Sequence, residues 1–348
     1  MKTRKILTLL YPVFLLVFLE VASRIFLFSG YGMQTIEKIS CDTSWRLLWA
    51  NKKRAGAGDI FYSFDEYSPT RGWAIKPNLT KTPVFGGKVL STNSKGIRGK
   101  TEYTYGKSSK KRILILGDSF TFGEEVNDTE AYPSRLQELL PASEVINFGV
   151  HGYAHDQMLI YLKEEGIKYR PDIIILGIVS NDIQRNILRF RDYAKPKFKI
   201  MDGKLKLENS PVPAPGEYLK REPYRSKLAD LLDLFRQVYR QKRGLDDQEM
   251  GTVTVAILDE LIAVARQNGA VPVLVYLPFG AELLADAPQD GFLPAYSRSR
   301  SVHYLSLQPV FHAKANSGVA LKVTGHWDET EHQIAAGAIR KYLSDNKI

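Results

Sequence analysis

The sequence predicts a three-layer α/β/α domain with a parallel sheet of about five strands, preceded by an N-terminal transmembrane helix. From residue 112 onward, short apolar runs alternate with segments of helical period. This alternation is typical of parallel strands joined by crossover helices. Ahead of it, the first 28 residues begin with basic side chains and continue as a strongly apolar run. With 348 residues, 44% of them hydrophobic, the chain is long enough for one such domain and an appendage.

The first segment, residues 1–28, is interpreted as a membrane anchor. Basic residues within the first five positions precede residues 6–19, which carry no charge, and Glu20 and Arg24 then interrupt the apolar run. As a helix, residues 6–28 would be about 34 Å long, which is enough to cross a bilayer. The basic flank is expected to stay in the cytoplasm, which places the rest of the chain in the periplasm or outside the cell. The alternative is a cleaved signal peptide, in which case the chain is exported and released.

Residues 29–105 are rich in Gly, Thr, Ser and Tyr and show no helical period after about residue 55. We therefore expect an N-terminal extension of short strands and loops packed on the edge of the main domain. Its Cys41 is the single cysteine of the chain, which excludes an intramolecular disulfide.

The main domain is expected to span residues 106–348, with an insertion at residues 183–248. In the insertion, residues 198–207 predict a β-hairpin around an Asp-Gly turn, and Ser226 is positioned to cap an amphipathic helix. Because the insertion follows directly on a polar segment at the end of a strand, it can overhang the site and influence substrate choice. Strands are expected at residues 112–116, 144–148, 172–177, 271–277 and 304–307, and core helices at 132–140, 157–166, 249–268 and 329–343.

The most informative segment is Gly117-Asp118-Ser119-Phe120, directly after the first of these strands. A serine at the carboxyl end of a parallel strand lies where ligands bind in α/β sheets. Its hydroxyl is exposed there to a base, as a nucleophilic serine requires. Taken alone, the segment fits equally well a strand-to-helix turn with a capping serine.

Three further segments follow in order: Gly152 after the second strand, Asn181-Asp182 after the third, and Gly325-His326 before the last helix. Together with the first segment they resemble the SGNH hydrolases, also called the GDSL esterase/acylhydrolase family. The resemblance covers about residues 110–345, and an approach segment at residues 72–98 is similar to that of membrane-anchored members. It implies a flavodoxin-like α/β fold and ester hydrolysis through an acyl-serine intermediate, with no metal or organic cofactor.

Each segment supplies one part of this chemistry. Ser119 is the candidate nucleophile and His326 the candidate general base. The backbone N–H groups of Ser119 and Gly152 and the side-chain amide of Asn181 are candidate donors to the oxyanion. The resemblance assigns the same roles to these positions. Among the other histidines, His332 is interpreted as structural.

The sequence departs from the family at the acid. The family commonly places an aspartate two or three residues before the catalytic histidine, where this chain has Val323 and Thr324. The Thr324 hydroxyl oxygen can accept a hydrogen bond from Nδ1–H of His326 but carries no charge. We therefore expect a Ser119–His326 dyad that Thr324 orients.

The functions that remain are a hydrolase of ester bonds, an O-acyltransferase acting on a cell-surface glycan, and a catalytically weak glycan-binding or assembly protein. Expected substrates are small-molecule, glycan or lipid esters. The net charge of +10 can favour anionic glycans or headgroups, although a solvated basic face explains it equally. No zinc-finger, helix-turn-helix or RNA-binding motif is visible, which argues against nucleic acid as a partner.

Overall fold

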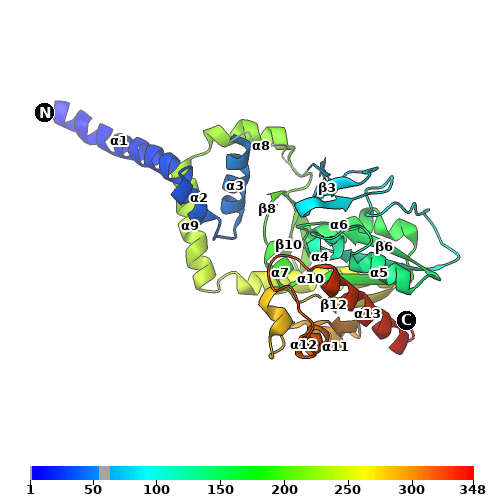
Figure 1. Ribbon diagram of the computed structural model, residues 1–348. Coiled ribbons are helices and arrows are strands. Elements are labelled where there is room, and N and C mark those ends of the chain that lie inside the picture. Colours follow the sequence, from blue (N-terminus) through cyan, green and yellow to red (C-terminus); the bar gives the residue numbers. More distant parts are fainter. Residues whose placement is uncertain (1, 55–62) are drawn as a thin grey trace.

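The computed structural model describes residues 2–54 and 63–348. At its centre lies a parallel five-stranded sheet in the order β13-β12-β7-β5-β6 (Figure 1). The second of these strands in the sequence, β6, lies at one edge of the sheet beside the first, β5. This is the flavodoxin-like doubly wound arrangement. The predicted fold class is therefore confirmed. The strands of this sheet are β5 (Lys111–Gly117), β6 (Ser143–Gly149), β7 (Ile173–Ile178), β12 (Val271–Tyr276) and β13 (His303–Ser306).

Both faces of the sheet are covered because the side chains of β5 alternate between two cores. Leu114 and Leu116 belong to one core, and Ile113 and Ile115 belong to the other. This alternation with apolar residues on both faces is typical of a buried parallel strand. The first core includes α6 (His155–Glu164), α10 (Asp247–Gln267) and α11 (Leu293–Arg300), and the second includes α5 (Tyr132–Leu139), α12 (Gln308–Asn316) and α13 (Glu329–Asp345).

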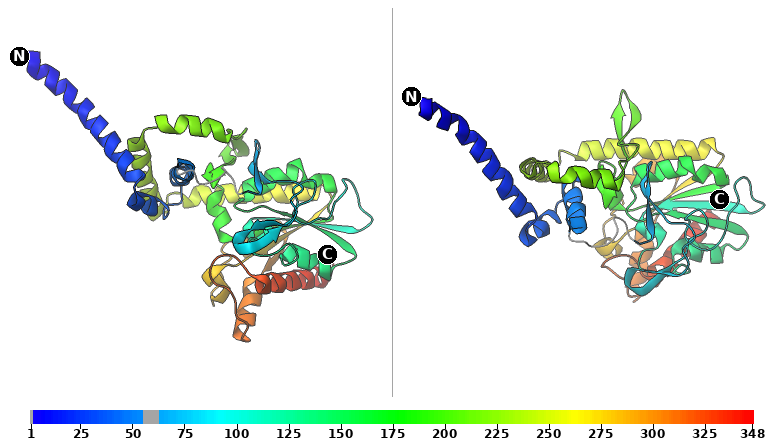
Figure 2. Two further views of the ribbon diagram at one scale, coloured as in Figure 1. Left: turned by 45° about the horizontal axis from the view of Figure 1, so that its top comes forward. Right: turned by 90° about the horizontal axis from the view of Figure 1, so that it is seen from above.

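Helix α1 (Lys2–Leu27) projects from the body as a long rod, which Figures 1 and 2 show from three directions. Among the described residues, its segment Leu10–Leu27 is the single stretch that is long and apolar enough to cross a membrane. Only 11% of that segment is buried against the rest of the protein. A helix of this kind near the N-terminus fits both a membrane anchor and a signal sequence.

The region that follows α1 differs from the expected strands and loops, because its first half is helical. It contains α2 (Gly30–Ile36) and α3 (Asp42–Arg54), whereas residues 55–62 lie outside the described part of the chain. On α3, Trp49 packs 5.4 Å from the ring of Tyr193, and Arg46 forms ion pairs with two carboxylates of the insertion. These partners lie far along the sequence, so the local pattern does not reveal the packing that stabilises α3.

The expected short strands follow as two antiparallel hairpins. One of them contributes Trp73, which is fully buried and donates a hydrogen bond from its indole N–H to the His151 carbonyl at 3.0 Å. The extension therefore packs against the loop after β6. The hairpins are formed by β1 (Asp65–Ser68) with β2 (Gly72–Ile75), and by β3 (Thr82–Val84) with β4 (Lys88–Leu90).

In the insertion, the predicted hairpin is present as an antiparallel pair of strands. The predicted cap is also present, because the Ser226 hydroxyl accepts a hydrogen bond from the Ala229 N–H at 3.1 Å. The elements of this region are α7 (Ser180–Arg185), β8 (Phe190–Arg191), β9 (Tyr193–Ala194), β10 (Lys197–Met201), β11 (Lys204–Glu208), α8 (Pro215–Arg221) and α9 (Lys227–Lys242).

Candidate active site

Ser119 begins a single helical turn, α4 (Ser119–Phe122), at the carboxyl end of the central strand β5. The Asp118 carboxylate caps this turn by accepting a hydrogen bond from the Phe120 N–H at 3.0 Å. This position is next to the point where the strand order reverses between β5 and β7, which is where open α/β sheets bind ligands. The Ser119 Oγ lies 2.8 Å from Nε2 of His326. The two residues, 207 positions apart in the sequence, thus form a hydrogen-bonded pair.

The ring of His326 is fixed by its neighbours on the loop before α13. Trp327 is buried and donates its indole N–H to the Pro278 carbonyl at 2.9 Å, which ties this loop to the end of β12. The Phe120 ring packs against the imidazole with centroids 5.0 Å apart. Asp328 and Glu331 form a capping box at the start of α13. The loop therefore presents the imidazole to Ser119 from a defined direction.

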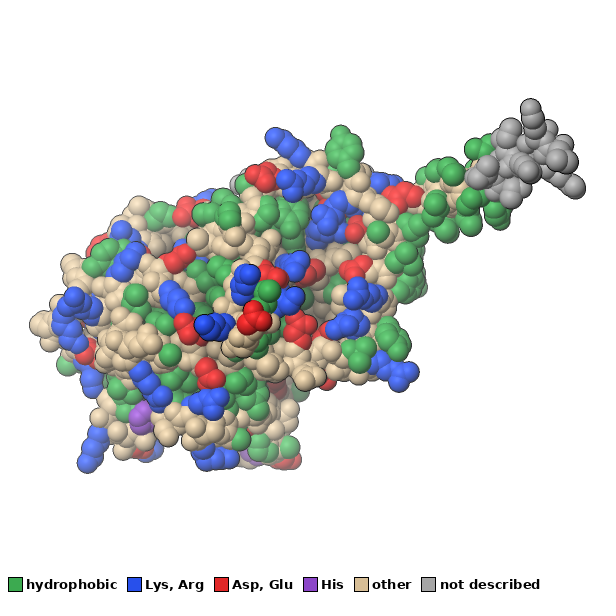
Figure 3. All heavy atoms as spheres, turned by 180° about the vertical axis from the view of Figure 1, so that it is seen from behind, with side chains coloured by type: hydrophobic (Ala, Val, Ile, Leu, Met, Phe, Trp, Pro, Cys, Tyr) green, Lys and Arg blue, Asp and Glu red, His purple; other side chains and the backbone are tan. Residues whose placement is uncertain are grey.

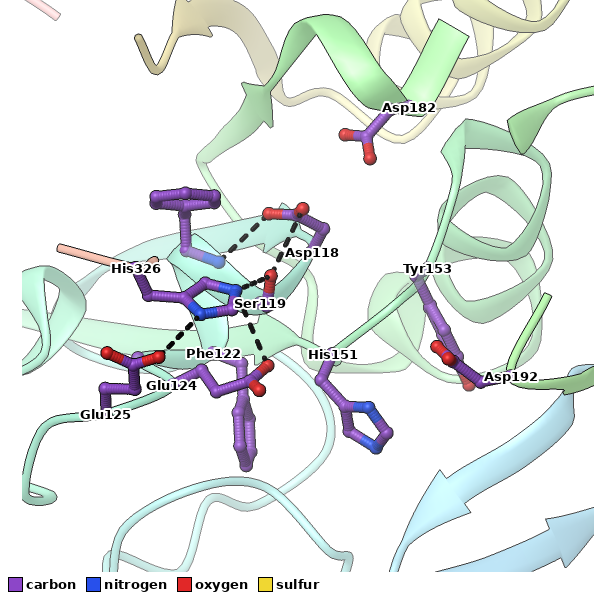
Figure 4. A network of polar contacts seen from close by, with 12 residues as sticks. Asp118, Ser119, Phe122, Glu124, Glu125, His151, Tyr153, Asp182, Asp192 and His326 are labelled. Carbon is purple, nitrogen blue, oxygen red and sulfur yellow. Dashed lines mark hydrogen bonds and ion pairs between the residues drawn. The ribbon is translucent and has the colours of Figure 1, made fainter. Parts of the chain in front are cut away.

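A carboxylate faces the other ring nitrogen of His326. Oε1 of Glu125 lies 3.3 Å from Nδ1, and Lys322 donates a hydrogen bond to Oε2 of the same carboxylate at 2.5 Å. Figure 4 shows the imidazole between Ser119 and Glu125. Although burial acts to raise the pKa of Glu125, the hydrogen bonds from Lys322 and His326 hold it below its usual range. Glu125 is therefore ionised at neutral pH.

Two backbone features allow Glu125 to reach this position. Its own φ is +67°, a left-handed conformation that is uncommon for residues other than glycine. Next to the histidine, Gly325 has a φ of +72°, and a Cβ there would lie 3.3 Å from Oε1 of Glu125. A residue with a side chain at position 325 would be strained by this φ and would also crowd the carboxylate.

The expectation that Thr324 orients the ring is not met. Thr324 is exposed, and among the described residues no hydrogen bond joins it to His326. Nδ1 faces Glu125 instead. The reason is tertiary: the carboxylate comes from the loop after α4, whereas the family pattern places the acid directly before the histidine. The signal that was missed is the pair Glu124-Glu125, five and six residues after the serine.

Glu124 lies near the other ring nitrogen of His326, with its Oε2 3.7 Å from Nε2 (Figure 4). Burial raises the pKa of this carboxyl, and the attraction of His326 opposes the rise only in part. The side chain is 16% exposed. Glu124 therefore lies near the Ser119–His326 pair but is not the orienting acid, because that acid accepts a hydrogen bond from Nδ1.

Arg185 joins the three loops that carry the candidate residues. Its Nη1 donates to the Asp182 carboxylate at 2.8 Å, to the Asp118 carboxylate at 3.2 Å and to the Tyr153 carbonyl at 3.3 Å. Burial and the neighbouring Asp118 raise the pKa of Asp182, so the guanidinium also separates two carboxylates that repel each other. The sequence pattern did not single out Arg185. It connects the first, second and third segments in a way that local patterns do not reveal.

The two remaining predicted residues, Gly152 and Asn181, lie on these joined loops. Gly152 has a φ of +71°, and a Cβ there would lie 2.6 Å from an oxygen of Asp192, a residue of the insertion. Asn181 is exposed in the first turn of α7. Among the hydrogen bonds of the described residues, none uses the N–H groups of Ser119 or Gly152 or the amide of Asn181. The oxyanion roles therefore stay a prediction.

Three other histidines have structural partners. His151 is buried against the Asp65 carboxylate at 2.8 Å. His155 lies against the side chain of Asn186, and His332 accepts a hydrogen bond at Nδ1 from a backbone N–H at 3.1 Å. In residues 2–54 and 63–348, no group of three or more His, Cys, Asp or Glu side chains is arranged to hold a metal ion.

The fold is that of a doubly wound α/β protein, with the hydrogen-bonded Ser119–His326 pair at the end of its central strand. A family model described as GDSL-like Lipase/Acylhydrolase matches residues 115–321, and the chain belongs to this family. Membership supports the hydrolysis of ester bonds in general. Comparison with curated proteins finds no match.

Similar solved structures include two bacterial enzymes. A GDSL-like lipase from Bacteroides thetaiotaomicron is 14% identical, with 70% of this chain and 92% of that chain covered and a TM-score of 0.40. An acetylxylan esterase from Geobacillus stearothermophilus is 16% identical, with 68% and 95% covered and a TM-score of 0.38.

Proposed function

We propose that the protein is a serine esterase that forms an acyl-Ser119 intermediate, with His326 as the general base and Glu125 as the acid that orients it. The observation that carries this proposal is the line of three side chains. Ser119 Oγ lies 2.8 Å from Nε2, and Glu125 Oε1 lies 3.3 Å from Nδ1 of the same ring. A serine triad uses the two ring nitrogens in this way.

In the first half-reaction, Ser119 Oγ attacks the ester carbonyl while its proton moves to Nε2 of His326. The negative charge passes to the carbonyl oxygen, for which the N–H groups of Ser119, Gly152 and Asn181 are the proposed donors. The tetrahedral intermediate then collapses. The bond to the alcohol oxygen breaks, and His326 returns the proton to that oxygen.

In the second half-reaction, water attacks the acyl-serine and gives its proton to Nε2. The acid product leaves with the oxygen of water, and Ser119 regains its proton from His326. In both halves the imidazolium is stabilised by the ionised Glu125 at Nδ1. Lys322 holds that carboxylate from its other oxygen, which limits rotation away from the ring.

We further propose that α1 anchors the enzyme, with the catalytic domain outside the cytoplasm. The basic residues at positions 2, 4 and 5 precede the apolar segment, which favours a cytoplasmic N-terminus. A site outside the cytoplasm can meet glycan and lipid esters as well as small-molecule esters. The insertion lies beside this site, because its Asp192 approaches Gly152.

The proposal is tested by intact-mass measurement of the full-length enzyme after rapid mixing with a short-chain aryl ester. Wild type should gain the mass of one acyl group, located on Ser119 by peptide analysis, whereas Ser119→Ala should gain none and lose turnover. His326→Ala should lose turnover while it keeps the fold, as judged by circular dichroism. Wild-type turnover by a folded Ser119→Ala protein would rule out the mechanism. If added oligosaccharide becomes acylated at the expense of the free acid, the enzyme is a transferase that uses the same intermediate.

A further inference from the structure

The end of α1 is fixed to the start of α9 through Glu20. Its carboxylate accepts hydrogen bonds from the Ser226 hydroxyl at 2.8 Å and from the backbone N–H groups of Lys227 and Leu228, both at 2.9 Å. A carboxylate at a helix N-terminus is favourable because it pairs with the unsatisfied N–H groups and the helix dipole. Arg24, one turn later, donates to two backbone carbonyls just before α9, at 3.3 and 3.0 Å. The start of α9 is therefore held beside Glu20 of α1, and the two helices keep a fixed position relative to each other at this point.

This attachment shortens the part of α1 that is free to enter a bilayer. Leu27 is fully buried in a small core that it shares with α3 and α9, so the end of α1 is held against the body. Ahead of Glu20, the uncharged residues 6–19 would rise about 21 Å as a helix. The hydrocarbon core of a bilayer is about 30 Å thick. The mismatch favours a position in which the body is drawn against the membrane surface.

An apolar stripe on α9 lies beside this attachment. Leu232, Phe235 and Tyr239 are 60%, 64% and 58% exposed, and their spacing places them on one face of the helix. Tyr224, directly ahead of the helix, is 89% exposed. In Figure 3 hydrophobic side chains continue from the projecting helix onto the adjacent edge of the body. Exposed apolar surface of this kind marks an interaction site.

We propose that α9 lies on the outer surface of the bilayer that α1 enters, with this stripe inserted among the headgroups and upper acyl chains. Continuity with α1 and the charge of α9 both favour a bilayer as the occupant. The second half of α9 and the next residue carry Arg236, Lys242 and Arg243, which complement anionic headgroups, whereas Arg240 is paired with Asp246. Tyrosine and arginine side chains favour this interface because each has an apolar body and a polar end. The proposal rests on the membrane anchor and not on the esterase mechanism.

The test introduces one exposed cysteine at a time into the full-length protein, whose native Cys41 is only 4% exposed and is therefore shielded from the label. Phe235→Cys is labelled with an environment-sensitive fluorophore and reconstituted into vesicles of phosphatidylcholine and phosphatidylglycerol that carry spin-labelled lipid. Val13→Cys on α1 reports on the anchor, and Lys341→Cys, whose native side chain is 75% exposed, reports on a distant helix. We expect quenching at 235 and 13 to exceed that at 341 about twofold or more, because an interfacial helix buries its apolar face about 5–10 Å deep.

Two comparisons make the result specific. Adding Leu232→Glu to the labelled 235 variant should lower quenching at 235, whereas the same substitution added to the labelled 13 variant should leave quenching at 13 unchanged. Quenching at 13 with none at 235 would overturn the docking of α9 and leave the anchor intact. The absence of quenching at both would overturn the anchor and the docking together. Energy transfer between labelled copies at 235 without lipid quenching would instead assign the stripe to a second copy. Acylation of Ser119 is measured separately and is independent of all these outcomes.

Discussion

Replacement of Glu125 by glutamine should reduce kcat by about 10- to 150-fold, which is about 1.4–3 kcal/mol. The change removes the charge 3.3 Å from Nδ1 of His326 and keeps the size of the side chain. At this separation an ion pair is worth about 1 kcal/mol in water and about 4–5 kcal/mol near a protein surface. The Glu125 side chain is 37% exposed and is shared with Lys322, so a value within this range is expected.

The loss should be smaller than the factor of about 10⁴ that the corresponding amide substitution causes in serine proteases, where the aspartate is buried. It should appear in kcat, with little change in KM, because the imidazolium forms only during the reaction. Hydrolysis of an aryl acetate at neutral pH, with kcat and KM determined separately, measures the effect.

Two further variants separate orientation of the base from a structural role of Glu125. Thr324→Asp alone should change little, because Nδ1 already has a carboxylate partner. In the Glu125→Gln background, Thr324→Asp should recover part of the activity if it restores a carboxylate to the ring. If Glu125→Gln retains kcat within about twofold of wild type, the Ser119–His326 pair acts without an acid and the triad proposal is refuted.

Three other predictions follow from the same structure. Asn181→Ala should lower kcat by about 10²–10³, or roughly 3–4 kcal/mol, with little change in KM, if its amide serves the oxyanion; an effect on KM alone would make it a substrate-binding residue. Burial lowers the pKa values of His155 and His332 to about 3, so the unfolded chain binds more protons between about pH 3 and 6.5 and stability falls as pH falls through that window. At about pH 5 each of these histidines should lower the free energy of unfolding by about 2 kcal/mol relative to neutral pH. His332→Gln should therefore make the melting temperature less dependent on pH. If this variant does not fold, urea titration of wild type at about pH 7 and 5 measures the same loss of stability. A C-terminal alkaline phosphatase fusion should be active in cells, whereas a C-terminal reporter active only in the cytoplasm would contradict the proposed topology; a mature N-terminus at Arg24 would show cleavage instead of anchoring.

The elements of the sheet could be predicted because each is encoded by adjacent residues. The run that ends at Leu116 is apolar on both faces, as a buried parallel strand requires, and its composition alone carries that signal. The same holds for the capping box of Asp328 and Glu331 and for the cap at Ser226, in which the partners are at most three residues apart. Helix α3 could not be predicted, because its stabilising contacts come from the insertion.

The sequence by itself determined the α/β class, the order of the four polar segments and the pairing of Ser119 with His326 as candidates. Only the tertiary structure decided that Glu125, and not Thr324, faces Nδ1, that Arg185 joins three loops, and that the start of α9 is fixed to α1. The physical reason is the range of the interactions. Strand period and helix caps depend on residues a few positions apart, whereas the acid and the base are 201 positions apart. Their meeting depends on how the loops pack at the end of the sheet.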